Sequence, residues 1–362
     1  SVRARKWFCT AQANWHHGAR DCALMLRCTR RHPPLFFTLP FLAMTPHGFA
    51  FLDQASFLAS AHVPPAQAAP FGIAGIAWDG AVTYRPGARF GPAAIRQASL
   101  MLCDATHPLF DLSPAGQIVD HGNLALPNTS LTALRAALEP RAQALLRAQH
   151  MVWLGGDHSI TLSLLRAARA VHGPLAVLHF DAHCDTWSDH FGEPSGHGTW
   201  VYEAMQEGLV VPSAFVQIGI RSAAQRAARE YVAQRGGRIC TARELRGRDG
   251  AALDPLITEI AARLRASGAP VYLSFDIDCL DPAFAPGTGT PEPGGLATSQ
   301  ALTLLEGLCA LDLPFVGMDC VEVAPAYDHA ELTASAAATL VWTYLCARLA
   351  AMQAQRAHGG QP

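Results

Sequence analysis

The stretch that decides the fold is His179-Phe180-Asp181-Ala182-His183-Cys184-Asp185, and Ser274-Phe275-Asp276-Ile277-Asp278 repeats its pattern about ninety residues later. Alternate side chains of an extended backbone point the same way, so the acidic and histidine side chains of each stretch share one face. Apolar β-type runs at 175–178 and 271–273 precede the two stretches. Both sets therefore lie where buried strands end, which is where open α/β sheets bind their ligands.

Strand-like runs alternate with amphipathic helical patterns from residue 71 onward. The candidate strands are 71–77, 117–120, 151–154, 175–180, 215–219, 238–240, 271–275 and 315–318. One candidate helix begins at Pro92, and the others cover about 130–148, 159–171, 222–235, 249–267, 298–310 and 331–352. This alternation predicts an α/β fold whose parallel sheet is covered by helices on both faces. Without a repeat or linker after residue 70, we expect a single domain over 45–355.

Composition excludes several classes of protein. The chain has 362 residues, 50% of them hydrophobic, which is enough for a large core. A formal charge of −2 and the lack of a basic stripe give no reason to expect nucleic acid as a partner. No apolar run reaches the roughly 18 residues of a membrane helix, so we expect no membrane partner. Ten irregularly spaced cysteines favour free thiols and a cytoplasmic protein.

Residues 1–44 differ from the rest of the chain. They hold seven Lys or Arg and a single acidic residue, Asp21, with no sustained period. Arg30-Arg31 before an apolar run resembles an export signal, and a basic leader also suits an organelle transit peptide. Prolines interrupt that run, so we favour a poorly ordered N-terminal extension, with a natural start at Met44.

The clustered carboxylates indicate a metal site. Carboxylates that converge in one crevice resist ionisation unless cations lie between them. A lone strand-end Asp is more often a cap and a lone buried His a core residue, but two alternating clusters are much more specific. Gly155-Gly156-Asp157-His158-Ser159 offers a further imidazole. Oxygen-rich ligands with one or two imidazoles suit Mn²⁺ or Mg²⁺ better than zinc, and a two-metal site activates water for hydrolysis.

The same residues carry a resemblance to the ureohydrolase (arginase/agmatinase) family, most of all to bacterial agmatinases, over about residues 70–350. The matching segments are 155–159, Asp181-Ala182-His183-Cys184-Asp185, Ser195-Gly196-His197-Gly198-Thr199, the long run 274–291, and 317–328 with Glu322. The resemblance implies a three-layer α/β/α sandwich around a mostly parallel eight-stranded sheet. It also implies homotrimers or homohexamers.

The resemblance further implies two Mn²⁺ ions and the roles of individual residues. One ion would be held by His158, Asp181, Asp185 and Asp276, and the other by Asp181, His183, Asp276 and Asp278. Glu322 would bind the substrate guanidinium through two charge-assisted hydrogen bonds. A hydroxide that bridges the ions would attack the central carbon, Asp278 would carry the first proton, and His197, at the mouth of the site, would relay it.

The substrate is expected to be agmatine, which would yield putrescine and urea. Asp189 and Glu193, in the loop after the first acidic stretch, suit a terminal ammonium better than a carboxylate. Trp200 stands where proline or methionine is common in the family, and we expect it near the mouth of the site. Hydrolysis of 4-guanidinobutyrate or 3-guanidinopropionate is the same-class alternative. A catalytically inactive metal-binding homologue that serves as a partner subunit is the alternative of another class.

Overall fold

The computed structural model describes residues 55–62 and 69–359. The chain from Gln54 onward forms one compact unit. The predicted extension over residues 1–44 lies outside the described residues, and the domain bounds of 45–355 stay a prediction. All seven cysteines within the described residues are free thiols.

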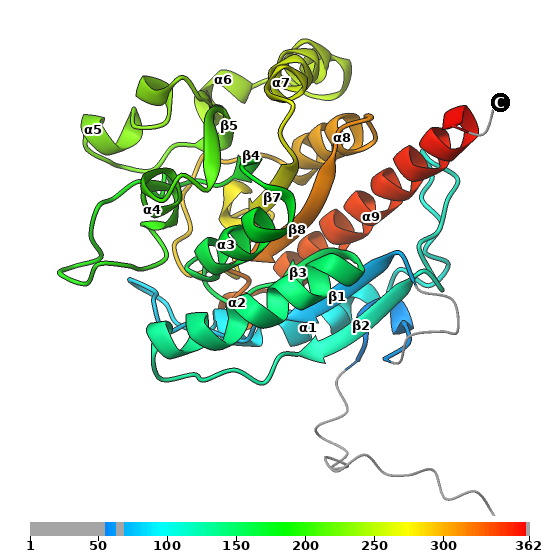
Figure 1. Ribbon diagram of the computed structural model, residues 1–362, viewed down its shortest axis with the longest axis horizontal. Helices are drawn as coiled ribbons and strands as arrows, with labels where there is room; N and C mark the ends of the chain where they lie inside the picture. The colour runs from blue at the N-terminus through cyan, green and yellow to red at the C-terminus, as the bar shows by residue number, and fades with distance from the viewer. Residues whose placement is uncertain (1–54, 63–68, 360–362) are drawn as a thin grey trace, which may run out of the picture. The chain divides into compact units, whose positions relative to one another are not determined.

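A single eight-stranded sheet forms the centre of this unit (Figure 1). Its strands are β1 (Phe71–Gly75), β2 (Ile118–Asn123), β3 (His150–Leu154), β4 (Leu175–Phe180), β5 (Val210–Ile220), β6 (Arg238–Thr241), β7 (Val271–Asp276) and β8 (Phe315–Val321). The strand order is β2-β1-β3-β8-β7-β4-β5-β6, and every pair is parallel. The predicted three-layer α/β/α fold is confirmed.

Helices follow most of the strands. They are α1 (Gly91–Ser99), α2 (Leu131–Ala148), α3 (Ile160–His172), α4 (Trp200–Gln206), α5 (Arg226–Arg229), α6 (Ala242–Leu245), α7 (Asp254–Ser267), α8 (Thr298–Cys309) and α9 (Leu332–Gly359). The helix predicted over 222–235 is wrong, because that segment holds only α5 and a 3-10 turn at Ala233–Arg235. Neither piece buries a residue, and a helix without a packed apolar face is marginal in water.

Two hydrophobic layers enclose the sheet. Alternate residues of β3 point to opposite sides. Met151 and Trp153 belong to the hydrophobic cluster that includes α2, α3 and α4, whereas Val152 and Leu154 belong to the cluster that includes α1, α7, α8 and α9. Because both faces of β3 are fully buried, its sequence is a continuous apolar run rather than an alternating one.

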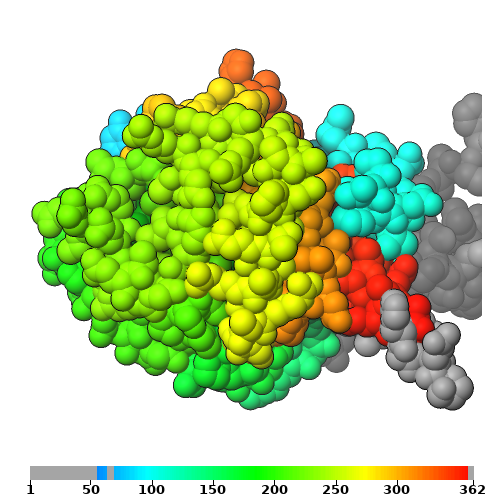
Figure 2. All heavy atoms as spheres, turned by 90° about the horizontal axis from the view of Figure 1, so that it is seen from above, coloured from blue at the N-terminus to red at the C-terminus, as the bar shows by residue number. Residues whose placement is uncertain are grey.

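Helix α9 packs against α1 and α8 and passes beside the segment around residue 105. By length and mean hydropathy, Leu332–Ala357 could cross a membrane, but 72% of its most apolar window is buried inside this molecule. Figure 2 shows its C-terminal part next to residues near 105, and Nε1 of Trp342 donates to the carbonyl of Ala105 at 2.8 Å. The burial is that of a core helix.

Strand order brings the predicted site together. The four central strands, β3, β8, β7 and β4, end next to one another at the carboxyl edge of the sheet. The segments that follow them carry His158, Glu322, Asp278 and Asp181–Asp185 in that spatial order, although their order in the chain differs. Parallel packing thus gathers four distant segments into one crevice.

Candidate active site

The segment after β4 turns away from the sheet with its polar side chains held by local hydrogen bonds. Oδ1 of Asp181 accepts from the backbone N–H of His183 at 2.6 Å, and its Oδ2 lies 2.8 Å from Nε2 of His179. Asp185 has a φ of +51°, a left-handed conformation that is unusual outside glycine. These contacts fix the direction of the first acidic stretch before any ligand binds.

The segment after β7 repeats this arrangement. Oδ1 of Asp276 accepts from the backbone N–H of Asp278 at 2.8 Å, which starts the 3-10 turn Ile277–Cys279. Oδ1 of Asp278 accepts from the backbone N–H of Ala182 at 3.1 Å. The two acidic stretches are therefore tied directly to each other.

His158 reaches the cluster from a glycine-containing loop after β3. A Cβ on Gly156 would stand 1.7 Å from the carbonyl oxygen of Trp78, so only glycine allows this close approach. Asp157 accepts from the backbone N–H groups of Ser159 and Ala81, at 3.0 and 2.8 Å. Its side chain therefore holds the turn that leads into α3 and does not enter the cluster.

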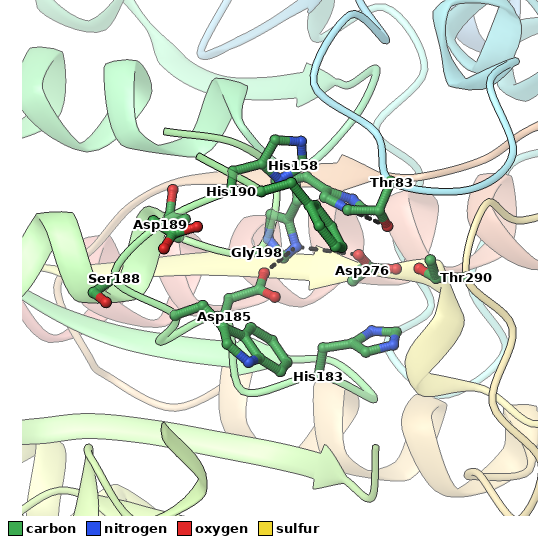
Figure 3. Close-up of a pocket in the computed structure, with 14 residues that line it drawn as sticks. Thr83, His158, His183, Asp185, Ser188, Asp189, His190, Gly198, Asp276 and Thr290 are labelled. Carbon is green, nitrogen blue, oxygen red and sulfur yellow. Dashed lines mark hydrogen bonds and ion pairs between the residues drawn. The ribbon is translucent and has the colours of Figure 1, made fainter. Parts of the chain in front are cut away.

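The six predicted metal ligands meet in one place, and Figure 3 shows His158, His183, Asp185 and Asp276 among them. Nδ1 of His158 lies 3.1, 3.2 and 3.1 Å from carboxylate oxygens of Asp181, Asp185 and Asp276. On the other side, Nδ1 of His183 lies 3.3 Å from Asp181 and 3.1 Å from Asp278. Donor atoms of His158, His179, Asp181 and Asp185 lie within 4.8 Å of one another, as do those of Asp181, His183 and Asp278. Asp181 belongs to both groups.

The chemistry of this cluster fits divalent cations. Burial first, then the charges of Asp278 and Asp181, raises the pKa of Asp276 well above its ordinary range. Burial and the charge of Asp181 likewise raise the pKa of Asp185. A cation between the carboxylates would reverse both effects, because it favours the ionised forms. Nδ1 of His158 is buried without a satisfied hydrogen bond, while its Nε2 lies 2.8 Å from Oγ of Ser274. That orientation leaves a nitrogen lone pair to face an ion.

Glu322 lies beside the cluster at the end of β8. It is buried and has a φ of +64°, so its backbone is held in a sparsely populated conformation. Oε1 accepts from the backbone N–H of His158 at 2.9 Å and lies 3.0 Å from Nδ1 of His197. Oε2 is buried with no hydrogen-bond partner. A buried carboxylate oxygen without a partner is costly, and a cationic donor from a substrate would satisfy it.

His197 connects Glu322 to the outer loop. Its Nε2 lies 3.0 Å from Oγ1 of Thr83. Burial lowers the pKa of His197, but the hydrogen bond and charge of Glu322 outweigh burial and raise the pKa to about 9. The imidazole is therefore protonated at neutral pH and is placed to donate a proton.

A cavity of about 470 Å³ opens over these residues. It is lined by Thr83, His158, His183, Asp185, Trp187, Ser188, Asp189, His190, Phe191, His197, Gly198, Thr199, Asp276 and Thr290. Asp189 lies on the side of the cavity away from Asp276 and Thr290 (Figure 3). Glu193, the other acid of the loop, is exposed and is not among the lining residues. Both acids were predicted to pair with the substrate tail, but only Asp189 lies where it could contact a substrate in the cavity.

Sequence reasoning missed two residues that contact the ligands. His179 lies two residues before Asp181, in the same alternating pattern of acidic and histidine residues. That pattern was the signal that could have identified His179. Trp200 was expected at the mouth, but it is fully buried behind the ligands, where Nε1 donates to Oδ2 of Asp185 at 2.7 Å. The prediction was wrong because α4, which Trp200 begins, was not recognised from the sequence.

Comparison with known proteins gives consistent matches. A family model described as "Arginase family" matches residues 69–347. The agmatinase of Cronobacter sakazakii is 44% identical over 274 residues, which are 74% of this chain and 84% of that protein. Among solved structures, a hypothetical agmatinase from Burkholderia thailandensis has a TM-score of 0.74 and 37% identity, covering 83% of this chain and 91% of that one. Proclavaminate amidino hydrolase from Streptomyces clavuligerus has a TM-score of 0.74 and 36% identity, covering 82% and 97%.

Proposed function

The chain belongs to the arginase family, which supports hydrolysis of a guanidino compound, and we propose that this compound is agmatine, cleaved to putrescine and urea. The observation that carries the proposal is the buried, partnerless Oε2 of Glu322, whose other oxygen contacts His158 and His197 in the cavity lining. A guanidinium has the planar N–H groups that such a carboxylate binds in a fork.

The ligands for two manganese ions would be those expected from the resemblance. His158, Asp181, Asp185 and Asp276 would hold one, and Asp181, His183, Asp276 and Asp278 the other. When bound, the two ions would supply a hydroxide nucleophile at neutral pH, since divalent ions lower the pKa of bound water toward about 7.

The protein's own groups orient the substrate and move protons. Glu322 holds the guanidinium so that its central carbon faces the carboxylate cluster, which restricts the reacting atoms to one approach. Asp278, whose Oδ2 accepts from Oγ1 of Thr290 at 3.2 Å, takes the proton of the oxygen that attacks the guanidinium carbon, and this proton is later relayed to His197. His197, protonated beside Glu322, donates a proton to the departing amine. The amine then leaves in its neutral form rather than as an unstable anion.

The choice of agmatine rests on the outer end of the cavity. Asp189 lines it, and the described lining residues include no Lys or Arg to meet a carboxylate tail. Guanidino acids remain the second candidate, because one solved relative, at 36% identity, is named for the carboxylate proclavaminate. A cytoplasmic location and assembly into trimers or hexamers stay predictions.

Urea release in the presence of Mn²⁺ tests the proposal. Purified protein is assayed on agmatine, arginine, 4-guanidinobutyrate and 3-guanidinopropionate. We expect the highest kcat/KM on agmatine. A tenfold preference for arginine or for a guanidino acid would replace the substrate assignment, and urea from none of them would favour the inactive homologue.

A further inference from the structure

Trp200 makes an unusual contact for a buried tryptophan. Its side chain is fully buried, and its Nε1 donates to Oδ2 of Asp185 at 2.7 Å. The buried indoles of Trp78 and Trp153 have no hydrogen-bond partner at Nε1. Burial in this core therefore does not itself bring an indole N–H to a carboxylate, and the contact with Asp185 is a specific one.

The backbone of the same helix holds the other end of Asp185. The N–H groups of Val201 and Tyr202 donate to the carbonyl oxygen of Asp185 at 3.1 and 3.4 Å. Asp185 has a positive φ, which costs free energy for a residue with a side chain. The start of α4 thus stabilises both the strained backbone of Asp185 and the direction of its carboxylate.

The indole also packs against imidazoles of the cluster. Its ring centroid lies 5.0 Å from that of His158 and 4.8 Å from that of His179. Nε2 of His179 in turn lies 2.8 Å from Oδ2 of Asp181. On the other side of the cluster, the imidazole of His183 lies near carboxylate oxygens of Asp181, Asp278 and Glu292. Trp200 therefore supports one half of the cluster.

We propose that Trp200 is a positioning residue that sets the affinity of one metal ion, the ion held by His158 and Asp185, separately from the other. The inference rests on the two-ion site of the proposed function. A carboxylate oxygen has lone pairs for both an N–H donor and an ion, so the indole aligns Oδ2 of Asp185 without blocking it. Loss of such an outer contact typically lowers metal affinity about 10- to 100-fold.

The test titrates Mn²⁺ into metal-free protein and measures free Mn²⁺ by electron paramagnetic resonance. We expect wild type to bind two ions, and Trp200→Phe to bind one of them about 10- to 100-fold more weakly with the other unchanged. Trp153→Phe is the matched control, because it shortens a fully buried indole whose N–H has no partner. Its two affinities should equal those of wild type.

Thermal unfolding of the metal-free proteins shows whether each variant still folds, so that a loss of metal affinity can be told apart from a loss of core packing. If Trp200→Phe does not fold, benzothienylalanine at position 200 keeps the bicyclic shape and replaces only the N–H by sulfur. Wild-type affinities in either variant, or an equal loss at both ions, would overturn the role of Trp200. A wild type that binds two ions but releases no urea would overturn the proposed function and leave this inference standing.

Discussion

Nδ1 of His197 lies 3.0 Å from Oε1 of Glu322, although the two residues are 125 positions apart in the chain. This contact leaves Oε2 of Glu322 free for a substrate and holds the imidazole next to the group that would leave. The pair therefore combines binding and proton transfer in one hydrogen-bonded unit.

Glu322→Gln is expected to lower kcat/KM on agmatine by roughly 100-fold or more. The substitution keeps the size and one acceptor oxygen but removes the charge, and hydrogen bonds to charged groups contribute about 1.5–3 kcal/mol each. Manganese content should stay at the wild-type value, because Glu322 is outside the proposed ligand set. Steady-state kinetics and metal analysis of the same preparation check both statements. A variant with wild-type kcat/KM would remove Glu322 from substrate binding.

His197→Asn is expected to lower kcat by about 10²- to 10⁴-fold with a smaller change in KM, since it removes a proton donor. The pKa of His197 is raised to about 9, so wild type keeps the protonated form below that pH and loses it as pH rises through it. The kcat of wild type should fall above about pH 9, and the variant should lack that fall. His121→Asn, whose ring pairs with Gln149 on the sheet edge, is the control and should keep wild-type kinetics. The same high-pH fall in the His197 variant would contradict this assignment.

Much of the fold was predictable because hydrophobic periodicity is a local property. The runs at 175–180 and 271–275 are apolar at every position or nearly so, which indicates strands buried on both faces. The two acidic stretches were recognisable locally from their alternating pattern, but the extended backbone expected there ends earlier. Strand β4 ends at Phe180, and Ile277–Cys279 is a 3-10 turn. Segment 222–235 shows the limit of this reasoning. Its pattern is helical, but neither α5 nor the 3-10 turn at Ala233–Arg235 buries a residue.

The parts that were not predictable depend on which segments become neighbours. Only the order β3-β8-β7-β4 shows that Glu322 accepts from the backbone of His158, 164 residues away. The burial of Trp200 likewise depends on α4 packing against α3 and β5, and the sequence of α4 gives no strong helical period over seven residues. Asp189 and Glu193 look equivalent in sequence, and the turn between them decides which one faces the cavity.

Asp189→Asn is expected to lower kcat/KM on agmatine about two- to fivefold, because an exposed ion pair contributes at most about 1 kcal/mol. Activity on 4-guanidinobutyrate should be unchanged or rise, since a repulsive charge is removed. The ratio of the two kcat/KM values measures the effect independently of enzyme concentration. Glu193→Gln changes the same charge in the same loop outside the cavity, so its ratio should equal that of wild type. An equal ratio in Asp189→Asn would remove Asp189 from substrate recognition.

Asp181→Ala and Asp276→Ala are each expected to abolish activity and to lower bound manganese below one ion per chain. Both residues would bridge the ions, so the loss of either leaves each ion short of a ligand. Elemental analysis after gel filtration measures the content, and the exposed Asp104→Ala is the control. Two ions per chain in both variants would show that these carboxylates do not bridge.

Arg96 and Asp120 form a buried ion pair that should make stability depend on acid pH. Nε and Nη2 of Arg96 donate to the two carboxylate oxygens of Asp120, each at 2.8 Å, and both side chains are fully buried. Burial raises the pKa of Asp120, but Arg96 and the backbone N–H groups of Phe57 and Gly122 outweigh it and leave the pKa below 3.8.

A lowered pKa means that the ionised carboxylate stabilises the fold. This contribution is complete above the unfolded value near 3.8 and is lost as pH falls through the lower folded value. At pH 7, Asp120→Asn leaves Arg96 buried without its charge partner and should lower the free energy of unfolding by about 3–5 kcal/mol. Urea unfolding of metal-free protein measures this difference, which should shrink in acid as wild type loses the same interaction. Asp312→Asn, at an exposed position that keeps its acceptor for Gln355, should show no difference at either pH. If the difference in unfolding free energy between wild type and Asp120→Asn stays constant from neutral pH into acid, the charge of the ion pair does not stabilise the fold.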